Sequence, residues 1–202
     1  MGVGNVGEKF SEQIHQQKKF LKENLKINLR VIALSNSRKM YFDEEGISLK
    51  DWQPLLELGE AADQEKFIAS VKELNLRNSI FVDITANESV SKTYEYYLKQ
   101  NIAVVTCNKI ACASEYDNYK KLKKLSQQFN APFLFETNVG AGLPIIDTVK
   151  NLVASGDKVN KIQAVLSGSL NFSFNNFDER NNFHDVVKEA GKLGCTEPDP
   201  KI

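Results

Sequence analysis

The chain has 202 residues, of which 42% are hydrophobic and 26% are charged, and its 26 lysines and arginines balance its 26 aspartates and glutamates. This composition is that of a globular protein with one large or two modest domains, and it gives no argument for a nucleic-acid or membrane partner. The sequence has no apolar run of membrane-spanning length, no signal-peptide order and no Cys-x-x-Cys pair, so we expect a cytoplasmic protein with reduced cysteines.

The first two thirds of the sequence predict helices that alternate with short apolar strands. The chain opens with Gly2-Val3-Gly4-Asn5-Val6-Gly7, and a helical pattern follows over about 6–25. Strands are predicted at 29–35, 80–84, 102–106 and 132–135, with helices at about 63–74, 89–100 and 114–129. This order predicts an α/β fold with a doubly wound, mostly parallel, Rossmann-like sheet. Because a glycine fingerprint normally follows a strand, we expect a sheet that lacks its first strand and leaves its neighbours with unpaired backbone groups.

The rhythm changes near Asn138. Gly140-Ala-Gly-Leu-Pro144 interrupts the chain, a helix is predicted at about 144–154, and a strand at 161–166 is followed by helices at about 170–178 and 183–193. We therefore predict two domains, 1–140 and 141–202, of which the second is the start of an α+β domain.

The opening glycines have the spacing of a dinucleotide-binding loop, although glycines in an ordinary turn would look the same. At the end of the predicted second strand, the sequence Ser35-Asn36-Ser37-Arg38-Lys39 places two cations where an acidic residue would select the unphosphorylated cofactor. Arginine pairs well with a ribose 2′-phosphate, so these residues favour NADP. The alternative is a solvated turn with two surface cations.

Three further positions carry reactive groups next to predicted strands or stiffened loops. Lys109 follows a strand at the sheet edge where ligands bind and could orient a substrate carbonyl or relay a proton; a surface lysine is the alternative. Glu136 precedes a glycine-containing loop, and spacing alone favours a helix cap over a cation site. Glu197 and Asp199 lie between prolines and could receive an ammonium or hydroxyl group, or belong to an unremarkable tail.

Several of these stretches in the same order resemble the homoserine dehydrogenase family, in particular the dehydrogenase part of bifunctional aspartate kinase–homoserine dehydrogenases. The resemblance covers essentially the whole chain. The matching motifs are Gly-Val-Gly-Asn-Val-Gly at 2–7, Ser-Asn-Ser-Arg-Lys-Met at 35–40, Val-Val-Thr-Cys-Asn-Lys at 104–109, Glu-Thr-Asn-Val-Gly-Ala-Gly-Leu-Pro at 136–144, Leu-Ser-Gly-Ser-Leu-Asn-Phe at 166–172 and Gly-Cys-Thr-Glu-Pro-Asp-Pro at 194–200.

The resemblance implies roles for individual residues, which are grouped here by ligand. The cofactor, NADP with NAD as the alternative, would contact Gly2, Gly4, Asn5, Val6, Gly7, Arg38, Lys39, Thr85 and Ala86. Lys109 would be the catalytic lysine. The substrate would contact Gly168, Thr196, Glu197 and Asp199. A sodium-type ion would be held by Glu136 with the carbonyls of Val139, Ala141 and Leu143, which reverses the preference for a helix cap.

The implied activity is NADP-dependent interconversion of L-homoserine and L-aspartate 4-semialdehyde, in threonine and methionine biosynthesis. Residues 1–140 would be the NAD(P)-binding domain and 141–202 part of a substrate-binding and dimerisation domain, in a homo-oligomer whose parent protein could carry a fused kinase. The family pattern starts before Met1 and continues beyond Ile202 with an Asp and a Lys, and family members usually have Tyr where this chain has Cys195. We therefore expect a segment truncated at both ends, with weak or no turnover. The alternatives are a nonenzymatic nucleotide-binding or dimerising remnant and another NAD(P)-dependent oxidoreductase.

Overall fold

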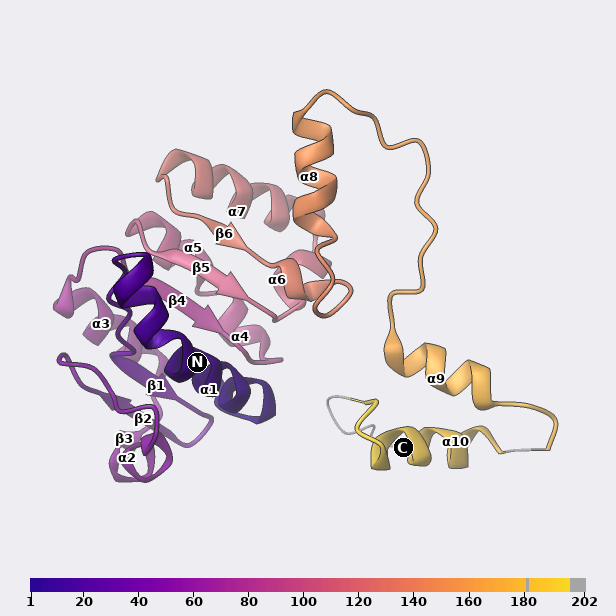
Figure 1. Cartoon of the computed structure of the whole chain (residues 1–202), viewed down its shortest axis with the longest axis horizontal. Coiled ribbons are helices and arrows are strands. Elements are labelled where there is room, and N and C mark those ends of the chain that lie inside the picture. Colours follow the sequence, from indigo (N-terminus) through magenta and orange to yellow (C-terminus); the bar gives the residue numbers. More distant parts are fainter. Residues whose placement is uncertain (181, 197–202) are drawn as a thin grey trace. The chain divides into compact units, whose positions relative to one another are not determined.

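The computed structural model describes residues 1–180 and 182–196. The chain divides into two compact units, Met1–Phe135 and Glu136–Ile202 (Figure 1). The sequence places the boundary at 140/141, whereas this division assigns Glu136 and the loop after it to the second unit. Among the described residues, no helix has both the length and the apolar character needed to cross a membrane.

The first unit contains two short sheets. Strands β4 (Ile80–Asp83), β5 (Ala103–Thr106) and β6 (Phe133–Leu134) are parallel and lie in the order β4-β5-β6. Strands β1 (Ala33–Ser35), β2 (Lys39–Phe42) and β3 (Glu60–Ala61) form an antiparallel sheet. The α/β class is confirmed, but the sequence pattern missed β2 and β3, because strands of four and two residues are too short to show periodicity.

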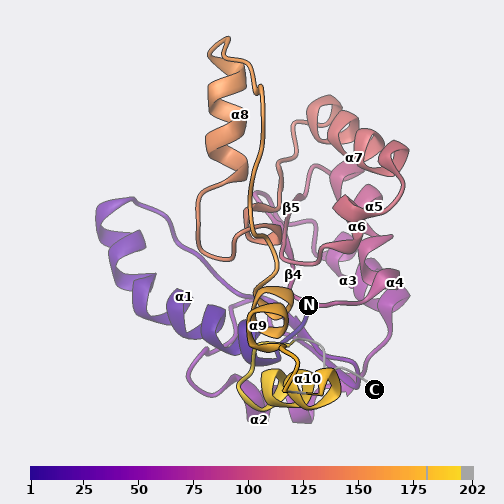
Figure 2. The same cartoon turned by 90° about the vertical axis from the view of Figure 1, so that its right-hand side faces the viewer.

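Helices lie on both sides of the parallel strands. Helix α1 (Asn5–Asn24) lies on one side of them, and α3 (Gln64–Leu74), α5 (Tyr94–Lys99) and α7 (Tyr116–Gln128) lie on the other (Figure 2). The remaining helices of this unit are α2 (Trp52–Leu58), α4 (Glu88–Ser91) and α6 (Ile110–Ala113). This arrangement leaves the carboxyl ends of β4 and β5 free to carry loops of the candidate site.

The core of the first unit is built around aromatic side chains. Tyr94, Tyr97 and Leu98 of α5 are fully buried. The Tyr97 ring stacks on Phe81 of β4, with ring centroids 4.0 Å apart. Such packing ties α5 to the parallel strands through a large apolar area and an aromatic contact.

The two sheets are joined by the first two residues of the chain. The Met1 amine donates to the Val82 carbonyl at 2.7 Å, the Ile84 amide donates to the Met1 carbonyl at 2.9 Å, and the Gly2 amide donates to the Ser35 carbonyl at 2.9 Å. Met1 and Gly2 therefore occupy the end of a strand position between β1 and β4.

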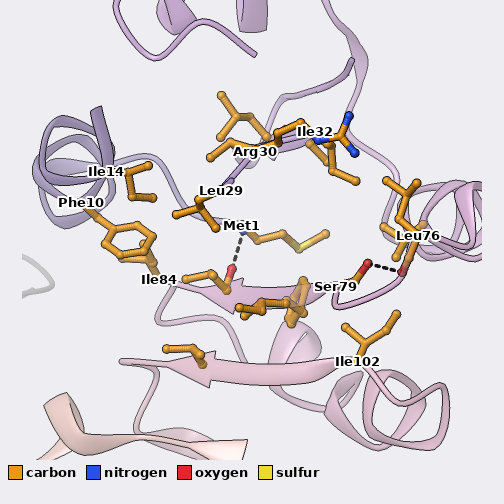
Figure 3. Close-up of a pocket in the computed structure, with 18 of the residues that line it drawn as sticks. Met1, Phe10, Ile14, Leu29, Arg30, Ile32, Leu76, Ser79, Ile84 and Ile102 are labelled. Atoms are coloured by element: carbon orange, nitrogen blue, oxygen red, sulfur yellow. Dashed lines mark hydrogen bonds between the residues drawn. The ribbon is translucent and has the colours of Figure 1, made fainter. Parts of the chain in front are cut away.

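An apolar cavity of about 450 Å³ extends from Met1 between these strands, and Phe10 and Ile14 of α1 point into it (Figure 3). Along a strand, the N–H and C=O groups of successive residues point to opposite sides, and those of Val82 and Ser35 point toward Met1 and Gly2. By the same alternation, the amide of Val82 and the carbonyl of Ile80 face the cavity from β4. Between β1 and β4, this structure therefore has the backbone of Met1 and Gly2 at the carboxyl ends and the cavity beyond them.

Two predicted elements differ in the structure. The predicted helix at 89–100 is divided into α4 and α5, and the Thr93 hydroxyl donates to the Val90 carbonyl at the break. The predicted strand at 161–166 is wrong, because residues 155–167 have no helix or strand and 161–166 are exposed. A strand needs a hydrogen-bonding neighbour, and the described part of the second unit contains no other strand that could pair with it.

The second unit consists of the one-turn helix η1 (Glu136–Asn138) and the helices α8 (Ile146–Ala154), α9 (Gly168–Asn176) and α10 (Phe183–Lys192). Helices α9 and α10 pack against each other through Phe174, Phe177 and Phe183. Val186 and Ala190 of α10 are buried. Helix α10 ends at Lys192, and the positive φ of 70° at Gly194, two residues later, lets the Cys195 amide donate back to the Ala190 carbonyl.

In the isolated 202-residue chain with Met1 as its free amino terminus, the buried Met1 amine predicts that stability rises between about pH 6 and pH 8. Burial lowers the pKa of this amine to about 6, partly offset by the negative charge of Asp83. In the unfolded chain the amine titrates near 8, so between these pH values the unfolded state binds more protons. The free energy of unfolding should therefore increase by about 2 kcal/mol as the pH rises from 6 to 8. Urea unfolding at several pH values measures this change.

The matched control is the same chain with an acetylated amino terminus, which keeps His15 and His184 but has no titrating amine. Equal pH dependence in the two forms would show that the Met1 amine is not responsible.

Candidate functional site

The glycine loop at the start of the chain has three glycines in three different environments. A Cβ at Gly2, where φ is +87°, would lie 2.5 Å from the Ile84 carbonyl oxygen, and a Cβ at Gly7 would collide with the Gly2 carbonyl oxygen. A Cβ at Gly4 would meet no atom within 4 Å. These are the requirements of a dinucleotide-binding loop: a tight turn, a point of open approach, and close packing of the helix on the turn.

Gly4 is also the N-cap of α1 and receives no side-chain cap. The first backbone N–H groups of a helix have no partners within the helix, and the helix dipole makes this end attractive to anions. The Gly4 end of α1, including Asn5 and Val6, therefore has the geometry and electrostatics to bind a pyrophosphate.

The loop after β1 is closed by Asn36. Its side-chain oxygen accepts hydrogen bonds from the amides of Arg38 and Lys39, each at 2.7 Å. The Lys39 ammonium group donates to the Gly59 carbonyl at 2.8 Å, whereas Arg38 is exposed and its side chain makes no hydrogen bond or ion pair with another described residue. Of the two predicted phosphate-binding cations, Arg38 is the one whose side chain is available in this arrangement.

A buried polar cluster lies at the carboxyl ends of β4 and β5. Asp83 is fully buried, and its carboxylate accepts hydrogen bonds from the Tyr94 hydroxyl at 2.6 Å, the Asn108 amide group at 3.0 Å and the Thr85 backbone amide at 2.8 Å. The Tyr94 hydroxyl also lies 2.8 Å from the Thr106 hydroxyl. Burial and the negative charge of Asp83 raise the pKa of Tyr94, so this hydroxyl stays protonated and can donate.

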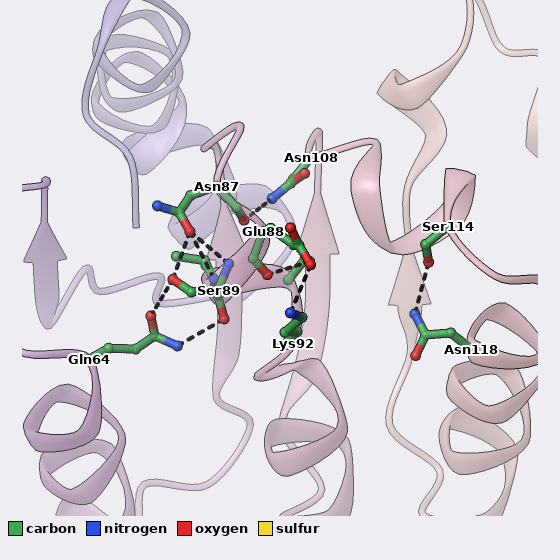
Figure 4. Close-up of polar contacts among 10 residues, drawn as sticks. Gln64, Asn87, Glu88, Ser89, Lys92, Asn108, Ser114 and Asn118 are labelled. Atoms are coloured by element: carbon green, nitrogen blue, oxygen red, sulfur yellow. Dashed lines mark hydrogen bonds and ion pairs between the residues drawn. The ribbon is translucent and has the colours of Figure 1, made fainter.

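The loop after β4 carries Thr85 and Ala86, and it is anchored on both sides. The Asn87 side chain caps α4, and Gln64 of α3 exchanges hydrogen bonds with Ser89 (Figure 4). The Asn108 side chain donates to the Asn87 backbone carbonyl at 3.0 Å. Thr85 also contacts the fingerprint, since its methyl carbon lies 3.0 Å from a Cβ built on Gly2.

Lys109 is exposed and directly precedes α6. Its neighbours in the sequence are held in place, because the Asn108 side-chain oxygen accepts from the Ile110 amide at 3.1 Å. The structure therefore brings the loops that contain Gly2, Ser35, Thr85 and Asn108 to one edge of the sheet, with Lys109 on the last of them.

Sequence reasoning missed Asp83 and Tyr94. Asp83 is the last residue of a strand in an otherwise apolar run, and an acidic residue at that position signals a buried polar role. Tyr94 gave no usable signal, because a tyrosine in a helix is most often an ordinary core residue. Only the fold brings its hydroxyl to Asp83.

In the second unit, Glu136 caps helix α8. Its two carboxylate oxygens accept hydrogen bonds from the amides of Ile146 and Asp147, each at 2.8 Å. This is the helix-cap arrangement that spacing alone favours. The Leu143 carbonyl accepts from the Ile145 amide at 3.0 Å, so two of the four predicted cation ligands have hydrogen-bond donors in this structure.

The loop of these predicted cation ligands nevertheless provides hard oxygen atoms in a short stretch. Ala141 has a positive φ of 51°, and the Gly140 carbonyl accepts from Leu143 at 2.9 Å. Carboxylate oxygens have additional lone pairs, so a cation and the α8 amides are compatible ligands of Glu136. No group of three or more His, Cys, Asp or Glu side chains suited to a metal occurs in the part of the chain that the structure describes.

A hydrogen bond in the second unit joins the neighbours of two predicted substrate residues. The Ser169 hydroxyl donates to the Cys195 carbonyl at 2.5 Å, which joins the segments that contain Gly168 and Thr196. The Thr196 hydroxyl is buried and has no hydrogen-bond partner among the described residues. A buried hydroxyl without a partner is costly and is consistent with a ligand that completes it. Glu197 and Asp199 lie outside the described residues.

Comparison with known proteins assigns both units. The family model "Homoserine dehydrogenase, NAD binding domain" matches residues 2–136, and the model "Homoserine dehydrogenase" matches residues 144–202. The bifunctional aspartokinase/homoserine dehydrogenase 1 of Arabidopsis thaliana is 42% identical over 203 residues, which cover 100% of this chain and 22% of that protein. The homoserine dehydrogenase of Schizosaccharomyces pombe is 33% identical, and the match covers 100% of this chain and 55% of that protein.

A solved structure of a hyperthermophilic archaeal homoserine dehydrogenase in complex with NADPH matches with a TM-score of 0.78 and 28% identity. The match covers 98% of this chain and 61% of that one. The chain thus spans only part of the relatives it matches. Both family models and the glycine loop geometry agree, and the chain belongs to the homoserine dehydrogenase family, an oxidoreductase family whose nicotinamide-cofactor domain it carries at residues 2–136.

Proposed function

We propose that this chain provides the cofactor site and part of the substrate site of an NADP-preferring homoserine dehydrogenase, which interconverts L-homoserine and L-aspartate 4-semialdehyde. The observation that carries the proposal is the meeting of four loops at one sheet edge, where Gly4 leaves a helix N-terminus open and Arg38 leaves a cation available. Bound NADP supplies the hydride-transfer chemistry.

The residues of the first unit have separate tasks in this proposal. The amide groups at the start of α1 bind the pyrophosphate, and Arg38 pairs with the ribose 2′-phosphate. Thr85 and Ala86 border the nicotinamide end. Lys109 donates a hydrogen bond to the substrate oxygen, which gains negative charge when the aldehyde is reduced and loses a proton when the alcohol is oxidised.

The second unit would supply the contacts that hold the amino acid. Gly168 and Thr196 would line the pocket, and Glu197 and Asp199 would receive the substrate ammonium and hydroxyl groups. The buried hydroxyl of Thr196 supports this assignment. A homo-oligomer, a fused kinase, as in the bifunctional relatives, and a cytoplasmic location remain predictions; the Arabidopsis relative is named as chloroplastic.

The assignment of Arg38 predicts a selective loss of affinity for NADPH. Removing one charge-assisted, bidentate contact costs roughly 1.5–3 kcal/mol, so Arg38→Ala should raise the Kd for NADPH about 10- to 100-fold. The Kd for NADH should change less than about twofold, because NADH lacks the 2′-phosphate. Fluorescence titration of both cofactors measures the two constants.

Arg77→Ala is the matched control, because Arg77 is also an exposed arginine but precedes β4 at the amino end of the sheet. Equal losses for NADPH and NADH in Arg38→Ala would contradict the 2′-phosphate contact. Saturable binding of neither cofactor by the unmodified chain would contradict the cofactor site itself.

The assignment of Lys109 predicts a loss of turnover with little loss of cofactor binding. Positioned proton transfer or hydrogen bonding to a reacting oxygen typically contributes about 10²- to 10⁴-fold. Lys109→Met should therefore lower kcat/KM for homoserine by that factor, while the Kd for NADPH stays within about threefold. The assay uses the full polypeptide that carries this sequence, with Lys92→Met as the control, since Lys92 is a surface lysine paired with Glu88.

We also propose that Glu136 and the carbonyls of Val139, Ala141 and Leu143 hold a sodium-type ion alongside the α8 amides. Glu136→Gln keeps an oxygen acceptor for the helix but removes the charge. It should therefore abolish the stimulation of activity by sodium chloride, measured against the same buffer without sodium. Asp147→Asn, on the same helix end, is the control. The same sodium response in Glu136→Gln and the unmodified protein would leave Glu136 only its capping role.

A further inference from the structure

The loops after β4 and β5 are joined by two buried polar side chains, Asp83 and Asn108, which are 0% and 2% exposed. Neither residue belongs to the predicted site, but each is close in the sequence to a residue that does. Thr85 is two positions after Asp83, and Lys109 is the residue after Asn108.

Asp83 holds the first of these loops. One carboxylate oxygen accepts from the Thr85 backbone amide at 2.8 Å, and the other accepts from the Asn108 side chain at 3.0 Å. No ion pair of Asp83 with a Lys or Arg side chain is found among residues 1–180 and 182–196, so hydrogen-bond donors satisfy this carboxylate. Charge-assisted hydrogen bonds of this kind are strong and directional.

Asn108 holds the second loop and reaches across to the first. Its side-chain nitrogen donates to the Asn87 carbonyl at 3.0 Å (Figure 4). The same nitrogen donates to Asp83, and the side-chain oxygen accepts from the Ile110 amide at 3.1 Å. The Asn108 backbone amide donates to the Thr106 hydroxyl at 2.8 Å. The backbone on both sides of Lys109 is thereby fixed relative to the loop of Thr85 and Ala86.

Global stability is a poor explanation for this pair. Burying a carboxylate costs several kcal/mol, and well-packed apolar residues of similar volume often serve stability as well or better. What a satisfied buried network provides is one defined geometry between the groups that it connects. In this structure it connects the two loops that the proposed reaction requires at a fixed spacing.

We propose that Asp83 and Asn108 form a positioning pair that sets the distance between the Thr85–Ala86 loop and Lys109, and so sets the rate of hydride transfer. The inference rests on the proposed function, because it assumes that these loops border the nicotinamide and the substrate. Neither residue touches the reacting atoms. Their effect passes through the backbone of Thr85 and of Lys109, and misplacement by about 1 Å can cost about 10²-fold in rate.

The test compares Asn108→Ala and Asp83→Asn with Tyr94→Phe in the full polypeptide that carries this sequence. All three variants remove a hydrogen bond to or from Asp83, but the Tyr94 hydroxyl bonds only to Asp83 and Thr106 among the described residues, at the ends of the two strands, and not to either loop. We expect Asn108→Ala and Asp83→Asn each to lower kcat about 10- to 100-fold, with KM for homoserine and Kd for NADPH within about threefold. The primary deuterium isotope effect on hydride transfer should increase. Tyr94→Phe should change kcat by less than about threefold and should leave the isotope effect unchanged.

The double variant tests whether the two residues act as a unit. If they do, Asp83→Asn combined with Asn108→Ala should lower kcat no more than about threefold beyond either single variant. Multiplicative losses, or losses equal to those of Tyr94→Phe, would overturn the proposal. Absence of NADPH binding and turnover in the unmodified protein would instead overturn the proposed function.

Amide hydrogen exchange provides a readout that needs no activity. In the folded Asn108→Ala chain, exchange at the Thr85 amide should accelerate at least about tenfold, although Thr85 is 23 residues away and its own acceptor, Asp83, is intact. Tyr94→Phe should leave this exchange rate within about threefold. Unchanged exchange at Thr85 in Asn108→Ala would also overturn the proposal.

Discussion

The backbone hydrogen bonds of Met1 and Gly2 are the constraint on which the candidate site depends. They connect the Ser35 end of β1 with the Val82 and Ile84 end of β4. Because these contacts lie at the carboxyl ends, they align the loops that follow both strands at one edge. The cavity beyond Met1 lies toward the amino ends and is apolar, so it has a different chemical character from the site.

The glycine loop shows how close packing and ligand access are combined in a few residues. Gly2 and Gly7 are required by the protein itself, because a side chain at either position would collide with a backbone carbonyl. Gly4 is not required in that sense, since a Cβ there meets no atom. The space above Gly4 is therefore the feature of the loop that a ligand explains best, and it coincides with the uncapped start of α1.

At the same edge, exposed cationic side chains are attached to backbone that buried polar side chains hold in place. Lys109 and Arg38 are exposed and free to reach a ligand, whereas Asp83 and Asn108 are buried and hold the backbone below them. An exposed cation has little desolvation cost, but its position is defined only when the backbone that carries it is rigid. In the second unit the Glu136 carboxylate performs a comparable task, because it fixes the start of α8 through two amide groups.

The sequence by itself determined the fold class, the helices α1, α3 and α7, the parallel strands and the loops that follow them. These features are local, since they depend on hydrophobic period, on caps such as Asp63 and on glycine spacing. Only the tertiary structure decided which cation stays available, because the contact between Lys39 and Gly59 joins residues 20 positions apart. It also decided that Glu136 caps α8, that residues 161–166 form no strand and that Tyr94 reaches Asp83. Each of these depends on a partner from a distant segment, which local pattern does not encode.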